Sequence, residues 1–133
     1  MIYLLDTHVF IWAVLETNRL SKNVHGLITN TNNEIYVSTV SFWEISLKTG
    51  INKFSFDNID IRNFPKYARN MGFNILDIQE NEAITFHELQ LKEKHKDPFD
   101  RMLIWQAITK NIIMISKDEL FEQYKKDGLK LVW

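Results

Sequence analysis

Cysteine is absent from this sequence of 133 residues, which excludes disulfide bonds and metal sites built on thiolates. Proline and glycine are scarce, at two and four residues, and no low-complexity tract or internal repeat divides the chain. The apolar stretch at residues 1–16 contains Asp6 and His8 and lacks a basic start, so we expect neither a signal peptide nor a membrane helix. Together these absences predict a cytoplasmic protein.

No charge of one sign dominates, because 16 Lys and Arg stand against 17 Asp and Glu, for a net charge of −1. This balance gives no global signature of nucleic-acid binding, although a local basic patch is compatible with it. Hydrophobic residues make up 45% of the chain and aromatics 13%, which is enough for a real core. At this length we expect one domain, residues 1–133, that buries about two-thirds of its unfolded surface.

Apolar runs typical of strands alternate along the chain with stretches typical of helices. We expect strands at residues 2–5, 35–37, 74–76, 112–115 and 129–133. We expect helices at residues 9–15, 21–30, 41–50, 61–71, 81–92 and 99–110, and a last helix that ends at Gly128. Gly72 and Gly128 directly follow predicted helices, where a glycine can adopt the positive φ that leads into the next strand. The alternation predicts an α/β fold, with a parallel sheet covered by helices on both faces.

Two aspartates follow predicted strands at the edge of the sheet where ligands bind in such folds. Asp6 comes directly after strand 2–5, and Asp118 comes shortly after strand 112–115. Their side chains would meet if these two strands are neighbours. The alternative is that each aspartate only caps a helix. That alternative is strong for Asp118 and weaker for Asp6, because Thr7 could cap the following helix instead.

Two further acids lie at predicted helix starts. Glu44 forms a capping-box pattern with Ser41, and capping alone would explain its presence. Asp97 precedes Pro98, as expected for an N-cap followed by proline at the first helical position. Asp100 then lies in the first turn, where it either stabilises the helix dipole or acts as a functional group that Asp97 positions. The recurrence of acids at one expected edge favours a functional site.

Four stretches in this order resemble the PIN-domain ribonucleases of the VapC toxin type. They are LLDTHVFIW with Asp6, VSTVSFWEIS with Glu44, HKDPFDRMLIWQA with Asp100, and IIMISKD with Asp118. The similarity runs from the first strand to the last, with one departure at Trp105, where relatives usually carry a small residue. The resemblance implies a parallel five-stranded sheet between two layers of helices, and cleavage of RNA with Mg²⁺ or Mn²⁺.

The resemblance also implies roles for single residues. The catalytic acids would be Asp6, Glu44, Asp100 and Asp118. Three of them, Asp6, Asp100 and Asp118, would form the metal site, with Asp6 and Asp118 closest to the ion and Asp100 and Glu44 holding its waters. Residues that orient these acids or the substrate would be Thr7, Asp97, Ser116 and Arg101. Oxygen ligands of this kind suit magnesium.

Such a mechanism needs no histidine base. We therefore expect all four histidines to be structural, with His95 hydrogen-bonded near a helix start; they are His8, His25, His87 and His95. Basic residues near two of the acids could contact RNA phosphates: Lys92, Lys94, Lys96, Arg101 and Lys117. For any one lysine a solvated surface is the simpler interpretation, and Arg101 could instead pair with an acid.

VapC-type relatives are inhibited by a cognate antitoxin, so the resemblance implies this partner as well as an RNA substrate and a homodimer. The apolar stretch from Val9 to Leu15, with Phe42 and Trp43, would suit a partner surface or, equally, the core. Two alternatives from other classes stay open: a phospho-receiver-like signalling domain, and a non-catalytic interaction module on the same fold. The first would need adjacent acids in one loop, where this chain has Asp-Thr-His.

Overall fold

The computed structural model describes residues 1–133. The strands are β1 Ile2–Leu5, β2 Glu34–Ser38, β3 Asn74–Leu76, β4 Ile113–Ile115 and β5 Lys130–Val132. The α-helices are α1 Thr7–Leu15, α2 Lys22–Thr29, α3 Thr39–Gly50, α4 Phe64–Asn70, α5 Glu80–Thr85 and α6 Pro98–Lys110. Four 3₁₀ helices complete the chain: η1 Thr17–Arg19, η2 Ile61–Asn63, η3 Phe86–Glu88 and η4 Glu119–Asp127. No helix is both long enough and apolar enough to cross a membrane.

All five strands form one parallel sheet in the order β3-β2-β1-β4-β5. The chain builds the sheet outward from β1 in one direction and then returns to β4 on the other side. The strand order therefore reverses between β1 and β4, where open α/β sheets leave a crevice at the carboxyl ends of the strands. This arrangement confirms the predicted α/β fold with five parallel strands.

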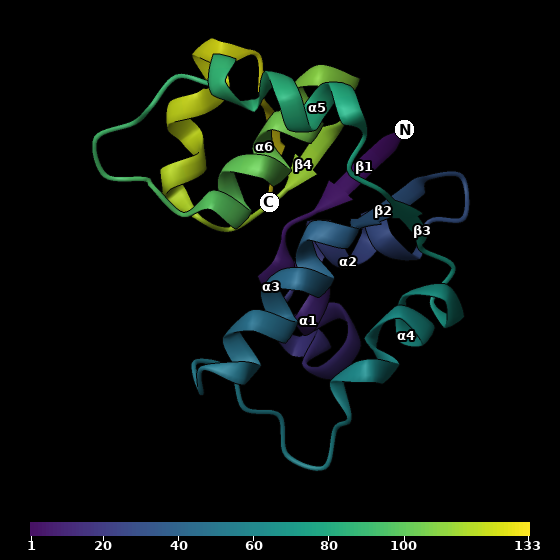
Figure 1. The fold of residues 1–133 in the computed structure, drawn as a ribbon. Coiled ribbons are helices and arrows are strands. Elements are labelled where there is room, and N and C mark those ends of the chain that lie inside the picture. Colours follow the sequence, from purple (N-terminus) through teal and green to yellow (C-terminus); the bar gives the residue numbers. More distant parts are fainter.

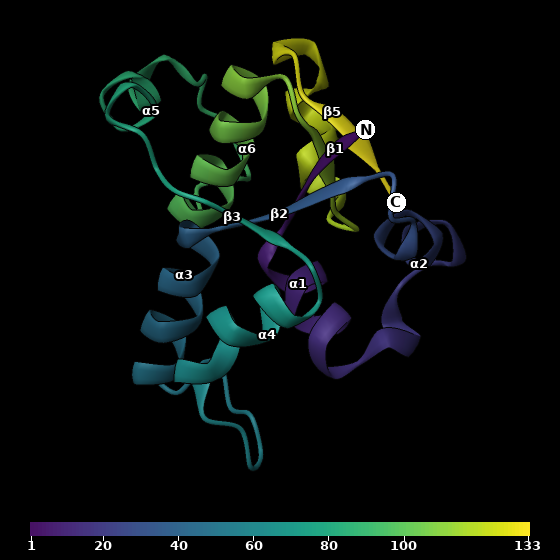
Figure 2. The ribbon, with the colours of Figure 1, turned by 90° about the vertical axis from the view of Figure 1, so that its right-hand side faces the viewer.

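Alternating side chains of the strands divide the core between the two faces of the sheet. Leu5 and Val37 belong to one cluster, which Phe10 of α1, Val24 of α2 and Phe64 of α4 complete. Leu4 and Met114 belong to the other cluster, together with residues of α6 and η4. Figures 1 and 2 show α5 and α6 on one side of the sheet and α1, α2 and α4 on the other. The prediction of helices on both faces is thus confirmed.

Helices α1 and α3 begin at other residues than expected, because the two residues expected to cap them, Thr7 and Ser41, are hydrogen-bonded to each other. Helix α1 begins at Thr7, and Asp6 rather than Thr7 caps it by accepting from Val9 N at 2.8 Å. Helix α3 begins at Thr39 with Ser38 as its cap, so the capping box expected at Ser41 is wrong. The Ser41 hydroxyl instead lies 2.9 Å from that of Thr7, linking the starts of α1 and α3.

The ends of the later helices agree with the sequence expectation only in part. The helix expected at residues 81–92 is shorter, because α5 passes into η3 and ends at Glu88. The last helix, η4, is of the 3₁₀ type and ends as expected at Gly128. Gly72 and Gly128 have φ of 79° and 105°, which confirms why glycine stands at these two turns.

Candidate active site

The acids predicted at the carboxyl edge of the sheet meet in one open pocket of about 390 Å³. Because β1 and β4 are neighbours, Asp6 and Asp118 lie at the same place in the sheet edge. Helices α3 and α6 bring Glu44 and Asp100 to it. We call this hollow the acid pocket; it is lined by Asp6, His8, Trp12, Glu44, Lys48, Asp97, Asp100, Lys117, Asp118 and Glu119. All four members of the predicted quartet therefore lie together.

Asp6 forms the floor of the acid pocket and is only 6% exposed. Its Oδ1 accepts from Val9 N, and its Oδ2 accepts a hydrogen bond from the hydroxyl of Ser116. The Ser116 oxygen also accepts from Asp118 N at 3.1 Å, which ties the two strand ends together. Burial raises the pKa of Asp6 to about 6, despite the two hydrogen bonds that favour its charged form.

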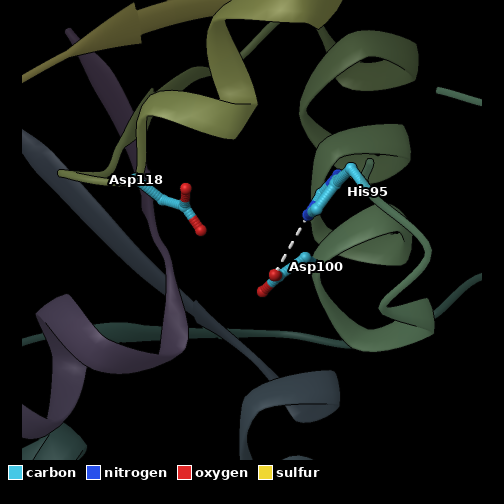
Figure 3. A group of neighbouring side chains, drawn as sticks. All are labelled: His95, Asp100 and Asp118. Carbon is cyan, nitrogen blue, oxygen red and sulfur yellow. Dashed lines mark hydrogen bonds and ion pairs between the residues drawn. The ribbon is translucent and has the colours of Figure 1, made fainter. Parts of the chain in front are cut away.

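Asp97 and Asp100 have different roles at the start of α6. Asp97 is the N-cap, because its Oδ1 accepts from Phe99 N at 2.9 Å and from Asp100 N at 3.2 Å. Asp100 turns into the acid pocket, where its Oδ2 lies 3.1 Å from His95 Nε2. Burial, followed by the charge of Asp97, raises the pKa of Asp100 to about 7. Figure 3 shows Asp100 and Asp118 approaching one another from opposite sides of the space, with His95 beside Asp100.

Lys48 is a pocket residue that the sequence analysis missed. It lies one helical turn after Glu44, and its ammonium donates to Glu44 Oε2. The same ammonium reaches Asp97 Oδ2 at 3.5 Å. Burial lowers the pKa of Lys48, but the hydrogen bond and charge of Glu44 outweigh this effect and raise it. The i,i+4 spacing of Glu44 and Lys48 was the available signal, since such pairs interact on a helix.

Several predicted residues lie outside the acid pocket. Thr7 is buried against Ser41. Arg101 is only 4% exposed and donates to the carbonyls of Leu89 and Gln90, so its guanidinium is not accessible to a phosphate, and it pairs with no acid. Lys92 is buried and paired with Asp127 at 2.6 Å, so its predicted phosphate role is also wrong. Lys94 and Lys96 are exposed but do not line the pocket, whereas Lys117 does.

Comparison with known proteins identifies the family. The model of the PIN domain matches residues 3–127, which is nearly the whole chain. The chain belongs to the PIN-domain family. This match rules out the phospho-receiver alternative. No match to the sequence was found among the curated proteins.

Solved structures share the PIN fold along the full chain. VapBC2 from Rickettsia felis, bound to a DNA fragment of its promoter, is 20% identical with a TM-score of 0.67, covering 99% of this chain and 98% of that one. DNA-bound VapBC from Salmonella typhimurium is 20% identical with a TM-score of 0.66, over 99% and 97%. VapBC-1 from Haemophilus influenzae is 20% identical with a TM-score of 0.63, also over 99% and 97%.

The carboxylate oxygens of the acid pocket are ligands of the kind that a divalent cation such as Mg²⁺ prefers. Ligand atoms of Glu44, Asp97 and Asp100 lie within 4.8 Å of one another, and so do those of His95, Asp100 and Asp118. Asp100 belongs to both groups, so a cation held by either group would touch it. Glu44 Oε1 is buried and has no hydrogen-bond partner. A buried carboxylate oxygen without a donor is the kind of group that a bound cation satisfies.

Two other side chains differ in their relation to the acid pocket, because His8 lines it and Trp105 does not. His8 lines it beside Trp12, and burial lowers the pKa of His8. Trp105, the departure from the family pattern, donates from Nε1 to Thr85 Oγ1 at 3.2 Å and so joins α6 to α5. Trp105 therefore affects helix packing away from the acids.

Proposed function

We propose that this PIN domain is an endoribonuclease that depends on Mg²⁺ or Mn²⁺. The observation that carries the proposal is the convergence of Asp6, Glu44, Asp100 and Asp118 on one pocket from four separate parts of the chain. Each acid alone could be a cap or a surface charge. Four acids in one partly buried hollow repel one another, and such a cluster is best explained by a cation.

Asp6 and Asp118, expected closest to the ion, both line the pocket, but Asp6 belongs to neither group of converging ligand atoms. Asp100 belongs to both groups, so Asp100 and Asp118 would hold the cation, and Glu44 and Asp97 would hold its waters. When bound, the metal would neutralise the scissile phosphate and make a bound water more acidic. Asp6 would accept hydrogen bonds at the pocket floor, where Ser116 and Val9 already fix its carboxylate. Lys117 is an exposed basic side chain of the pocket and would attract the phosphate backbone, whereas Lys48 is already paired with Glu44 and Asp97.

The proposed biological role is that of a toxin controlled by a cognate antitoxin, acting as a homodimer. The supporting observation is that three of the similar solved structures are VapBC complexes, and a fourth is FitAB bound to a DNA fragment at a TM-score of 0.65. The expected partner surface needs a correction, because Val9, Phe10 and Ile11 are buried in the core. Trp43 remains available, since it is 60% exposed on α3.

The direct test is cleavage of RNA by the purified chain with magnesium or with a chelator. We expect cleavage only with the metal, and loss of cleavage in Asp6→Asn. Asp57→Asn is the matched control, because Asp57 is an exposed acid outside the pocket. Wild-type protein that binds magnesium but never cleaves RNA would favour the non-catalytic interaction module instead.

A further inference from the structure

A buried chain of hydrogen bonds runs behind Asp100 and is not explained by metal binding itself. Arg101 donates from its two terminal nitrogens to the carbonyls of Leu89 and Gln90, and also to the hydroxyl of Tyr124 at 3.1 Å. The Tyr124 hydroxyl lies 2.8 Å from His95 Nδ1. His95 Nε2 then lies 3.1 Å from Asp100 Oδ2. Arg101, Tyr124 and His95 are all buried.

The direction of each hydrogen bond follows from counting donors and acceptors. An arginine can only donate, so the Tyr124 oxygen accepts from Arg101. The Tyr124 proton then has one partner within reach, which is His95 Nδ1. Because Nδ1 accepts, the proton of a neutral imidazole must be on Nε2, and Nε2 donates to the Asp100 carboxylate.

The opposite arrangement leaves groups unsatisfied. If Nδ1 carried the proton, it would donate to the Tyr124 oxygen, and the Tyr124 proton would be buried without an acceptor. A buried donor without an acceptor is unfavourable, because it loses its hydrogen bonds to water and gains none from the protein. Above the raised pKa of Asp100, the lone pair of Nε2 would in this arrangement face an ionised carboxylate oxygen, with no proton between them. The hydrogen bonds of Arg101 and Tyr124 therefore favour the His95 tautomer with its proton on Nε2.

We propose that His95 is a positioning residue for Asp100, held by Tyr124 and Arg101 so that the proton on its Nε2 is donated to Asp100. In this role His95 holds Oδ2 and leaves Oδ1, which has no hydrogen bond to the protein, available to a cation. The proposal rests on the proposed function, because it concerns the same pocket. It also gives Arg101 a role, since Arg101 acts through Tyr124 and His95 instead of touching substrate.

The same geometry offers a competing role that the proposal excludes. His95 lies close enough to Asp100 and Asp118 to be a third metal ligand (Figure 3). A ligating imidazole must present a lone pair, so Nε2 could not carry a proton. Donation to Asp100 and ligation by the same nitrogen are mutually exclusive.

The first test is made on wild-type protein, first without metal and then with magnesium, and variants serve only to assign the signals. Nitrogen-15 spectra of the imidazoles, recorded at one mildly alkaline pH, distinguish protonated from unprotonated ring nitrogens. The His95 signals are assigned by their loss in His95→Gln, with exposed His87→Gln as the control. We expect the proton of His95 on Nε2, before and after magnesium is added. A proton on Nδ1, or loss of the Nε2 proton when magnesium binds, would overturn the proposal.

The second test compares two amides at position 95 by calorimetric titration with magnesium. A glutamine can place its amide nitrogen near the position of Nε2 and still donate to Asp100, whereas asparagine is too short. Hydrogen-bond partners of metal ligands contribute about 10- to 100-fold to affinity. We expect His95→Asn to weaken binding at least about tenfold and His95→Gln to stay closer to wild type. Equal affinities for wild type and His95→Asn would contradict the positioning role.

The outcomes separate this proposal from the proposed function. If wild type does not bind magnesium at all, the nuclease proposal fails, and the tautomer of His95 in metal-free protein still tests the hydrogen-bond chain. If magnesium binds and Tyr124→Phe leaves the His95 spectrum unchanged, the chain from Arg101 does not set the tautomer. The nuclease proposal would survive that result.

Discussion

At the scale of single residues, the two aspartates around Pro98 have separable roles. Asp97→Ala removes the acceptor for two backbone N–H groups and should lower the free energy of unfolding by about 1 kcal/mol. Asp100→Asn removes no cap and should abolish magnesium-dependent cleavage while the fold stays intact. Denaturant unfolding and RNA cleavage of the two variants check this division. Equal losses of stability would show that the roles were divided wrongly.

Lys48 compensates the buried charge of Glu44, so removing Lys48 should destabilise the fold. Glu44 is almost fully buried, so Lys48→Met leaves a buried carboxylate without its cation. Because Lys48 itself is partly exposed, its loss should destabilise the fold by about 2 kcal/mol, less than the loss of one partner from a fully buried pair, and unfolding in chelator should show this. The double variant Lys48→Met with Glu44→Gln should recover most of the loss. A double variant as unstable as Lys48→Met alone would point to lost packing of the lysine stem.

At the scale of the elements, the start of α3 gives a prediction that compares two serines. Ser38 accepts from Val40 N and donates to Gln106 Oε1 at 2.6 Å, whereas Ser41 has a single partner in Thr7. Ser38→Ala should therefore cost about 1 kcal/mol more than Ser41→Ala, the usual contribution of an N-cap. Thermal melts of both variants measure the difference. A larger loss in Ser41→Ala would restore Ser41 as the cap.

The same elements show what the sequence could and could not predict. That Asp6 and Asp118 lie at one edge of the sheet was predictable, because each follows a strand of a parallel sheet, but the pairing of β1 with β4 needed the structure. The hydrogen bonds of Arg101 could not be predicted, because its partners are carbonyls of a loop and the hydroxyl of Tyr124, which lies 23 positions away in the sequence. His95 was expected near the helix start, but its link to Tyr124 needed the tertiary structure.

At the scale of the whole molecule, the raised pKa values of Asp6 and Asp100 predict how stability depends on pH without metal. Folding raises the pKa of Asp6 from the ordinary value of 3.8 to about 6 and that of Asp100 to about 7. Between pH about 4 and these values, both carboxyls therefore bind protons more tightly in the folded than in the unfolded chain. Stability should therefore fall as pH rises through this window. Asp100→Asn lacks one of the groups, so its advantage over wild type should grow with pH, to on the order of 2 kcal/mol. Unfolding of both proteins in chelator across the window checks this, and a constant difference would contradict it.

Magnesium should reverse that order, and a pair of thermal melts tests directly whether the acid pocket is a cation site. The ion binds the folded wild type alone, so about 2.7 kcal/mol of stability should be gained at a concentration a hundredfold above Kd. Wild type and Asp100→Asn are melted at neutral pH, once with chelator and once with millimolar magnesium. We predict that the variant melts higher in chelator and that wild type gains far more from magnesium. Equal gains in the two proteins, or no gain in wild type, would show that these carboxylates do not bind the metal.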